Sequence, residues 1–270
     1  MTTTSRKQQI IARIRQWPGG VMLSFIVRQA WAALFGGLLL IAIVVTSYVE
    51  LPWLSRYDWL FVIAVLIQLA MLAFRLERPR EVLIILIFHL VGLAMELFKT
   101  SHSIQSWTYP EENIIRLGTV PLFSGFMYAA VGSYIARAWR VLNLRFTHYP
   151  PRRWTILLAV LIYGNFFTHH YLPDIRVLLF IGAALLYWRT RVYFTLNLRE
   201  HHMPLLVGFT LIASVIWVAE NVGTYTKAWL YPTQATTWEM VGISKLGAWF
   251  LLMIISFIMI ELMNYLRTRR

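Results

Sequence analysis

The 270-residue sequence contains no cysteine and has few charged residues. The lack of cysteine excludes disulfide bonds, thiolate catalysis, zinc–thiolate sites and iron–sulfur clusters. Charged residues make up 14% of the chain and hydrophobic residues 59%, with a mean hydropathy of +0.60. A soluble globular chain has about 25% charged residues. Because a soluble fold of this length needs more polar surface, the composition predicts a membrane protein.

The chain also lacks segments in which apolar and polar residues alternate, the pattern of strands in transmembrane barrels. The chain instead has long unbroken apolar runs, such as residues 30–49 and 246–262. Runs of this length predict an all-α polytopic membrane protein. We expect eight transmembrane helices, at residues 30–49, 57–74, 82–98, 117–139, 154–170, 175–190, 204–222 and 244–266.

The net charge of +13 comes from basic residues that lie between the apolar runs. With both termini inside, 19 of the 25 lysines and arginines fall in cytoplasmic segments, as the positive-inside rule requires. We therefore expect an inner-membrane-type protein that contacts anionic headgroups on its cytoplasmic side and binds no nucleic acid. Residues 1–28 are basic and interrupted by Pro18-Gly19-Gly20, so we expect no cleavable signal peptide, and residues 8–17 fit a short interfacial helix.

A sequence pattern occurs twice, about 123 residues apart. It combines E-x3-T, a short spacer and W-x-Y-P, in residues 96–110 and again in residues 220–232. The pattern predicts a tandem duplication, with an N-terminal segment at 1–29, one four-helix repeat at 30–142 and a second at 143–270. An even number of helices gives both repeats the same orientation, related by an axis along the membrane normal.

The repeat places Glu96 and Glu220 at the same depth, near the outer ends of matched helices. An ionisable group inside a membrane is costly, so each is a candidate functional residue. His89 lies two helical turns before Glu96 and faces the same side, which adds a candidate relay. Alternatively, the two glutamates have a structural role, in which Glu96 forms an ion pair with Lys99 and Glu220 forms one with Lys245.

Other polar and aromatic residues are expected near the two glutamates. Asn165 and His169 are four residues apart and share a helix face. We assign His169, with His89 and the glutamates, to the candidate catalytic residues. The candidate substrate-binding residues are Trp107, Tyr109, Tyr128, Asn165, Trp229 and Tyr231, although an aromatic belt at the outer membrane surface explains the loop residues as well. The seven histidines lack metal-binding helical spacing, so we expect no metal and no cofactor.

The stretch from Glu96 to Thr100, the segment Ser106 to Pro110 and the run Val120 to Tyr134 resemble a known bacterial family. It is domain-of-unknown-function family 817, the YoaT-like integral membrane proteins. The resemblance extends over most of the chain and implies a membrane protein, without an activity. Membrane carotenoid hydratases and lycopene cyclases are similar in a weaker way, in a helix-end Glu, an aromatic loop and a following Pro-led helix. Here Lys99-Thr100 replaces their glycine-rich sequence.

Three functions fit these observations. In an enzyme, Glu96 or Glu220 would protonate a membrane-embedded isoprenoid or other lipid, with aromatic faces stabilising the cation. In a proton-coupled transporter, the two carboxylates would lie at the interface between repeats, although we expect no span to be broken at its centre. In an accessory membrane protein there would be no site. The sequence leaves the substrate and the oligomeric state open.

Overall fold

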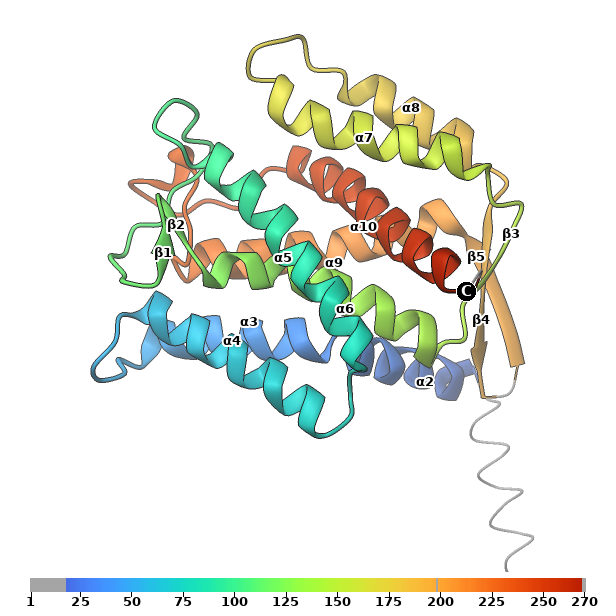
Figure 1. The fold of residues 1–270 in the computed structure, drawn as a ribbon, viewed down its shortest axis with the longest axis horizontal. Coiled ribbons are helices and arrows are strands. Elements are labelled where there is room, and N and C mark those ends of the chain that lie inside the picture. The colour runs from blue at the N-terminus through green and yellow to red at the C-terminus, as the bar shows by residue number, and fades with distance from the viewer. Residues whose placement is uncertain (1–17, 198, 269–270) are drawn as a thin grey trace, which may run out of the picture.

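The computed structural model describes residues 18–197 and 199–268 (Figure 1). The interfacial helix expected at residues 8–17 lies outside them. The chain is mostly helical, and its helices are α2 (Pro18–Ala32), α3 (Leu34–Tyr48), α4 (Arg56–Ala73), α5 (Pro79–Lys99), α6 (Phe123–Val141), α7 (Arg152–Thr168), α8 (Arg176–Tyr187), α9 (Leu205–Tyr225), the 3-10 turn η1 (Pro232–Gln234) and α10 (Ser244–Thr268).

Four of these helices are long and apolar enough to cross a membrane. They cover Arg56–Ala73, Glu81–Lys99, Leu205–Tyr225 and Ser244–Leu266. The pair α2 and α3 makes a fifth if it counts as one bent span. Each of the eight predicted spans overlaps a helix, although residues 117–122 of the fourth span belong to β1, β2 and their turns. The helices α6, α7 and α8 are not among those long and apolar enough to cross, and α7 and α8 have only 17 and 12 residues, so a count of eight spans stays a prediction.

The first predicted span differs from the structure at its start. The Pro18-Gly19-Gly20 sequence forms the first turn of helix α2. Proline is tolerated at the first helical position, because its missing N–H would have no partner within the helix there. The helix then breaks at Ala33, and α3 continues at an angle of 72°. Arg28 fixes α2 beside the end of α6, because its Nη1 donates to the carbonyl of Val141 at 3.0 Å.

Two small sheets correct the all-α prediction. Strands β1 (Arg116–Leu117) and β2 (Val120–Pro121) form a short antiparallel pair, and β3 (Arg145–Thr147), β4 (Arg191–Leu196) and β5 (Arg199–Pro204) form an antiparallel sheet in the order β3-β4-β5. In β4, buried Val192, Phe194 and Leu196 alternate with less buried residues, as in a strand with one covered face.

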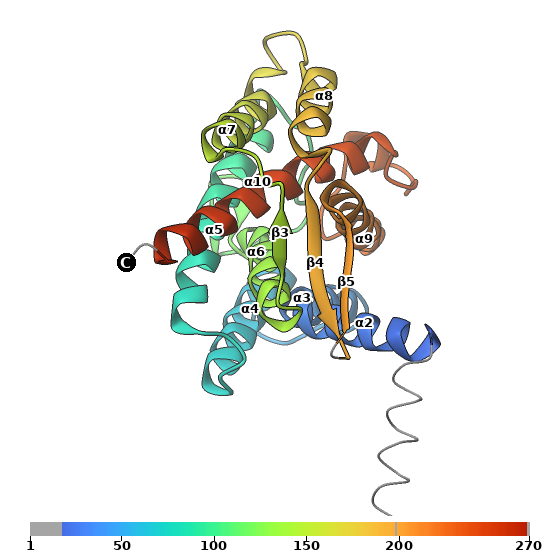
Figure 2. The ribbon, with the colours of Figure 1, turned by 90° about the vertical axis from the view of Figure 1, so that its right-hand side faces the viewer.

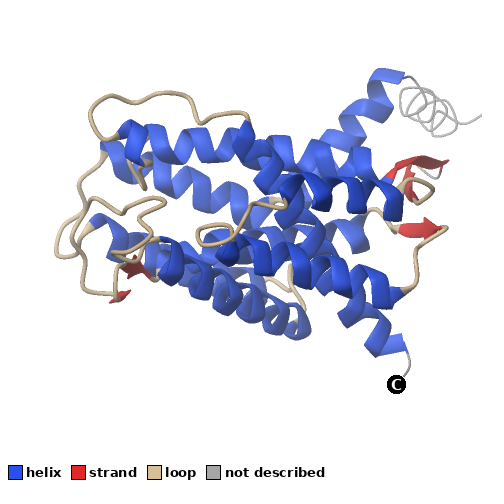
Figure 3. Cartoon of the chain, turned by 90° about the horizontal axis from the view of Figure 1, so that it is seen from above, coloured by secondary structure: helices blue, strands red, loops and turns tan. Residues whose placement is uncertain are grey.

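Most helices run lengthwise between two ends of the molecule (Figures 1 and 3). Strands β3 to β5 cover one end, and β1, β2 and the long loops form the other. Figure 2 shows the three strands in front of the helices, with α2 beside them. The first residues of α2 and the last residues of α10 both lie on the side of the molecule with the larger sheet, as expected if both termini are on one side of a membrane.

Large apolar side chains cover much of the helical surface. Examples are Ile41, Leu66, Leu86, Val160 and Val215, which are each between 51% and 69% exposed. Exposed apolar surface on this scale is unfavourable in water and is the normal outer surface of a helix in lipid. The surface therefore agrees with the apolar helices in favouring a membrane protein.

Candidate functional site

The two W-x-Y-P segments lie side by side. The backbone N–H of Thr108 donates to the carbonyl of Leu230 at 2.9 Å, and the N–H of Leu230 donates back to Thr108 at 2.9 Å. The Trp107 and Tyr231 rings meet edge to face, with 6.3 Å between their centroids. Segments about 122 residues apart in sequence thus form one structure at the end of the molecule opposite the large sheet.

Glu96 is buried and accepts hydrogen bonds from three aromatic side chains. Trp107 Nε1 and the Tyr109 hydroxyl both donate to Oε2 at 2.8 Å, and the Tyr128 hydroxyl donates to Oε1 at 2.8 Å. Tyr128 reaches this position because α5 and α6 pack closely at Gly92, where a Cβ would lie 2.5 Å from the Tyr128 ring. The carboxyl group of Glu96 is therefore held by neutral donors.

Glu220 has the same kind of surroundings. It is buried near the C-terminal end of α9 and accepts hydrogen bonds from the Tyr231 hydroxyl and from Trp249 Nε1 on α10. Trp229, the counterpart of Trp107, does not bind Glu220. It packs instead on Gly223, where a Cβ would lie 2.0 Å from a carbon of the indole ring. The two glutamate sites are alike in chemistry and differ in detail.

The loop tyrosines remain protonated donors. Burial, and then the charge of Glu96 and the hydrogen bond to it, raise the pKa of Tyr109 well above its ordinary value. Burial and the charge of Glu220 do the same to the pKa of Tyr231. A tyrosine hydroxyl both donates and accepts, whereas an indole N–H only donates. Each site therefore accommodates its carboxyl group in either protonation state.

Both glutamates line one cavity of about 1000 Å³ between the helices. Its walls are mainly apolar and come from α2, α3, α5, α6, α7, α9, α10 and the β3–β5 sheet, with Arg176 at the start of α8. Its polar lining is concentrated around Glu96 and Glu220. A cavity of this size and composition suits a largely apolar ligand with few directed polar contacts.

Nearly all the residues predicted from the sequence line this cavity. Besides the glutamates these are Trp107, Tyr109, Tyr128, Asn165, His169, Trp229 and Tyr231. His89 does not line it. Its imidazole packs between α5 and α6, 4.7 Å from the Phe126 ring and in contact with Gly125. Helical periodicity placed His89 on the face of Glu96, but the packing of α6 separates it from the cavity.

The lysines do not form the ion pairs that we considered. Among the described residues, neither glutamate is within 4.0 Å of a basic group. Lys99 Nζ instead lies 2.7 Å from His170 Nε2 and 3.4 Å from His169 Nε2. Lys245 Nζ lies 4.1 Å from the centroid of the Tyr231 ring. The aromatic donors leave no room for the predicted glutamate–lysine pairs.

Sequence reasoning missed Trp249 and the cavity wall formed by α2. Trp249 follows Tyr128 by about 121 residues, which is close to the spacing of the repeated W-x-Y-P pattern. Applying that spacing beyond the pattern would have found it. Phe25 and Gln29 of α2 carry no comparable signal, because they lie in the N-terminal segment 1–29, before the first predicted span.

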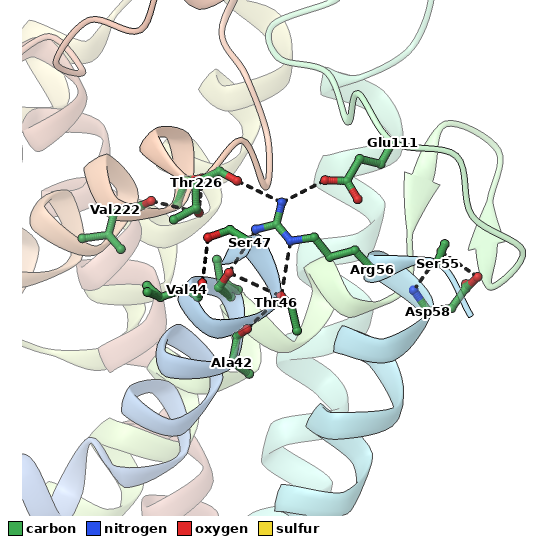
Figure 4. A network of polar contacts seen from close by, with 12 residues as sticks. Ala42, Val44, Thr46, Ser47, Ser55, Arg56, Asp58, Glu111, Val222 and Thr226 are labelled. Atoms are coloured by element: carbon green, nitrogen blue, oxygen red, sulfur yellow. Dashed lines mark hydrogen bonds and ion pairs between the residues drawn. The ribbon is translucent and has the colours of Figure 1, made fainter. Parts of the chain in front are cut away.

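Arg56, at the start of α4, connects the loops after α5 and α9 to the end of α3 through hydrogen bonds (Figure 4). Its Nη1 bonds to Glu111 Oε1 at 2.8 Å and to the carbonyl of Thr226 at 2.9 Å, while Nη2 bonds to the carbonyl of Ile43 at 3.0 Å. Asp58, in the same first turn of α4, accepts from the backbone N–H groups of Ile114 and Ile115. These bonds fix the loops that bring the W-x-Y-P segments together.

The fold and the site define a class of protein: a mostly helical chain, with several helices able to cross a membrane, that encloses an apolar cavity around two buried glutamates. The chain belongs to the family described as "Protein of unknown function (DUF817)", which matches residues 21–257. It is 44% identical over 232 residues to the uncharacterized protein YoaT of Bacillus subtilis (strain 168), a match that covers 86% of this chain and 87% of the relative. No solved structure matches the chain significantly. The predicted family resemblance is confirmed.

Proposed function

We propose that the protein is a membrane enzyme that acts on an isoprenoid or another lipid bound in the cavity, with Glu96 and Glu220 as acid and base. The observation that carries this proposal is that two buried carboxyl groups face one large apolar cavity. A site for a polar solute would need more polar lining. A purely structural carboxylate would not need a cavity beside it.

The chemistry that suits the site is proton transfer to an alkene. A protonated glutamic acid gives its proton to one alkene carbon, the π electrons form the new C–H bond, and the other carbon becomes a cation. The faces of Trp107, Trp229 and Trp249 stabilise that cation through their ring quadrupoles. The cation then loses a proton to a carboxylate, or takes up water and releases a proton to it. Tyr109, Tyr128 and Tyr231 reverse their hydrogen bonds as the carboxyl groups change protonation state.

We further propose that eight helices, α3 to α10, cross the bacterial inner membrane as two parallel repeats of four, with both termini in the cytoplasm. The reciprocal hydrogen bonds of Thr108 and Leu230 support the repeat, because a two-fold axis relates paired segments in this way. Tyr128 and Trp249 support it too, since each donates to its own glutamate from a matched helix. The short helices α7 and α8 would cross by tilting little and thinning the bilayer locally.

The test replaces each glutamate by an isosteric amide in cells that lack the native gene. Lipid extracts of cells expressing the wild type, Glu96→Gln or Glu220→Gln are compared by mass spectrometry. We expect a wild-type product that falls by about 100-fold or more in both variants, because general acid–base catalysis contributes at least that much. The matched control is Glu112→Gln, which alters an exposed loop carboxylate and should preserve the product. Unchanged lipid profiles in both variants would disprove the enzyme.

A second candidate, a proton-coupled transporter, is favoured by one observation. The cavity is lined on one side by α2 and α3, which form a helix broken by 72°, and broken helices mark the binding sites of many transporters. Liposomes that contain the purified protein and an internal pH dye distinguish the two. Proton uptake that requires Glu96 or Glu220 would favour transport, and its absence, with a Glu-dependent lipid product, favours the enzyme.

A further inference from the structure

Three basic side chains lie at the polar end of the cavity. Lys99 at the end of α5, Arg176 at the start of α8 and Lys245 at the start of α10 all line it. They come from helices far apart in the sequence and meet beside the W-x-Y-P segments. Lys99 is 5% exposed, so it is not a surface lysine turned toward water.

Lys99 is surrounded by neutral acceptors. His169 Nδ1 lies 2.7 Å from the carbonyl of Asn165, and because a carbonyl only accepts, Nδ1 carries the proton. The Nε2 of His169 is then a lone-pair acceptor directed at Lys99. His170 Nε2 accepts from Lys99 at 2.7 Å in the same way. No carboxylate lies within 4.0 Å of the Lys99 ammonium in the described part of the chain.

The other two basic groups add positive charge without neutralising Lys99. Lys245 lies over the Tyr231 ring and 5.7 Å from the Trp107 centroid, and Glu220 attracts it from beyond ion-pair distance. Arg176 is bound to Asp174 at 2.5 Å, and Asn165 holds the other oxygen of Asp174. Lys99 is close enough to be repelled by both Lys245 and Arg176.

Holding like charges together at the end of an apolar cavity is unfavourable without an anion between them. Glu220 attracts Lys245 and Asp174 attracts Lys99, but among the described residues no carboxylate lies within 4.0 Å of either lysine, so neither lysine has a direct anionic partner. From this arrangement we infer that the substrate carries an anionic headgroup, a phosphate ester, which Lys99 and Lys245 bind while its apolar chain fills the cavity. The inference rests on the proposed function, since it makes the cavity the substrate site, and it narrows the substrate to an apolar lipid phosphate.

A phosphate ester suits the donors better than a carboxylate does. Lysine is a flexible point charge that binds phosphate oxygens in several directions, and Lys99 and Lys245 approach from different helices. The imidazoles of His169 and His170 hold the Lys99 amino group in place by accepting its hydrogen bonds. The apolar wall of α2, α9 and α10 then accommodates the chain of the same molecule.

Binding of dodecyl phosphate to the purified full-length protein in a neutral detergent tests the inference. Microscale thermophoresis gives the Kd for the wild type, Lys99→Met and Lys245→Met, with dodecanol as the uncharged probe of equal chain length. We expect the wild type to prefer dodecyl phosphate by about tenfold or more, and each variant to lose about tenfold in that Kd, as for hydrogen bonds to a charged group. Dodecanol binding should not change, which also shows that the variants are folded. The matched control is Lys227→Met, an exposed lysine at the same end of the molecule.

Two results would overturn the inference: equal binding of dodecyl phosphate and dodecanol by the wild type, or unchanged phosphate binding in both lysine variants. Inorganic phosphate that displaces dodecyl phosphate at equal concentration would show a site for free phosphate and overturn the lipid assignment. The two proposals fail separately. If Glu96→Gln loses the product but binding of dodecyl phosphate does not depend on the lysines, only the assignment of a phosphate headgroup is disproved. If binding depends on the lysines but no product depends on the glutamates, only the proposed enzyme function is disproved.

Discussion

At the scale of single residues, the site depends on matching each buried carboxyl oxygen with a neutral donor. Glu96 has three aromatic donors and Glu220 has two. A buried acceptor that loses a partner carries the full cost of its lost hydration. The stability of the protein should therefore respond to the removal of single hydroxyl groups around these glutamates.

Tyr128→Phe removes the one donor to Glu96 Oε1 and changes nothing else in the ring. We expect a loss of about 1–3 kcal/mol in the free energy of unfolding, because one carboxyl oxygen becomes a buried acceptor without a partner. Thermal unfolding in detergent measures it as a melting temperature lowered by several degrees. Tyr171→Phe is the control, since Tyr171 is 70% exposed and should tolerate the change. Equal melting temperatures for Tyr128→Phe and the wild type would contradict this account of Glu96.

The residues of the site were predictable where a repeated pattern marked them. Glu96, Glu220 and the aromatic pairs of W-x-Y-P follow from a comparison of the chain with itself. His89 was placed wrongly beside the cavity, because periodicity gives the face of a helix and does not show which neighbour covers that face. The partners of Lys99 were not predictable either, since His169 and His170 approach it from α7, and nothing in the sequence gives the distance between α5 and α7.

At the scale of elements, close helix contacts through glycine position the aromatic rings. Gly92 admits the Tyr128 ring between α5 and α6, and Gly223 admits the Trp229 ring beside α9. Helices packed through small residues are common in membrane proteins, where lipid provides no hydrophobic force between helices. These glycines are therefore part of the site although neither touches the cavity.

Gly223→Ala should destabilise the protein, because the new Cβ would lie 2.0 Å from a carbon of the Trp229 ring, so that the ring or the backbone must shift to admit it. We expect a cost of about 1–3 kcal/mol in the free energy of unfolding, as in other overpacked cores. Gly164→Ala on α7 is the matched control, since no atom lies within 4 Å of its added Cβ and alanine favours a helix. Urea or thermal unfolding compares the two, and a Gly223→Ala protein as stable as the control would refute the contact.

Helices were easier to predict than their breaks and the strands between them. Apolar runs located all eight helices from α3 to α10, because lipid-facing helices need little besides length and hydrophobicity. The break at Ala33 follows from contacts such as the bond from Arg28 to Val141, which connect segments more than 100 residues apart. Strands β4 and β5 have only six residues each, too few for alternation to stand out in a sequence this apolar.

At the scale of the whole molecule, the two ends differ in charge and structure. The end with β3 to β5 holds both ends of the described chain and the strand residues Arg145, Arg191 and Arg199, while the opposite end holds the W-x-Y-P segments. The positive-inside rule predicts that the first end faces the cytoplasm. The orientation is open to a direct measurement, because the chain has no native cysteine.

Single cysteines introduced at Ser103 and Asn143 report on opposite sides, since both residues are exposed and lie in loops at different ends. In intact spheroplasts, a membrane-impermeant maleimide should label Ser103→Cys and should label Asn143→Cys only after the membrane is broken. The expected reason is that residue 103 lies in an outer loop and residue 143 in an inner one. Labelling of Asn143→Cys in intact spheroplasts would reverse the proposed orientation.

The unmatched positions of the two lysines have a consequence for stereochemistry. In the second repeat the position equivalent to Lys99 is Gly223, and in the first repeat the position equivalent to Lys245 is Ser124. The surroundings of Glu96 and Glu220 are therefore not interchangeable. A phosphate held by these lysines would enter the cavity in one direction only, and a given carbon of its chain would always meet the same glutamate on the same face. Two nearly equivalent acids would in this way give a single regioisomer and a single enantiomer of the product.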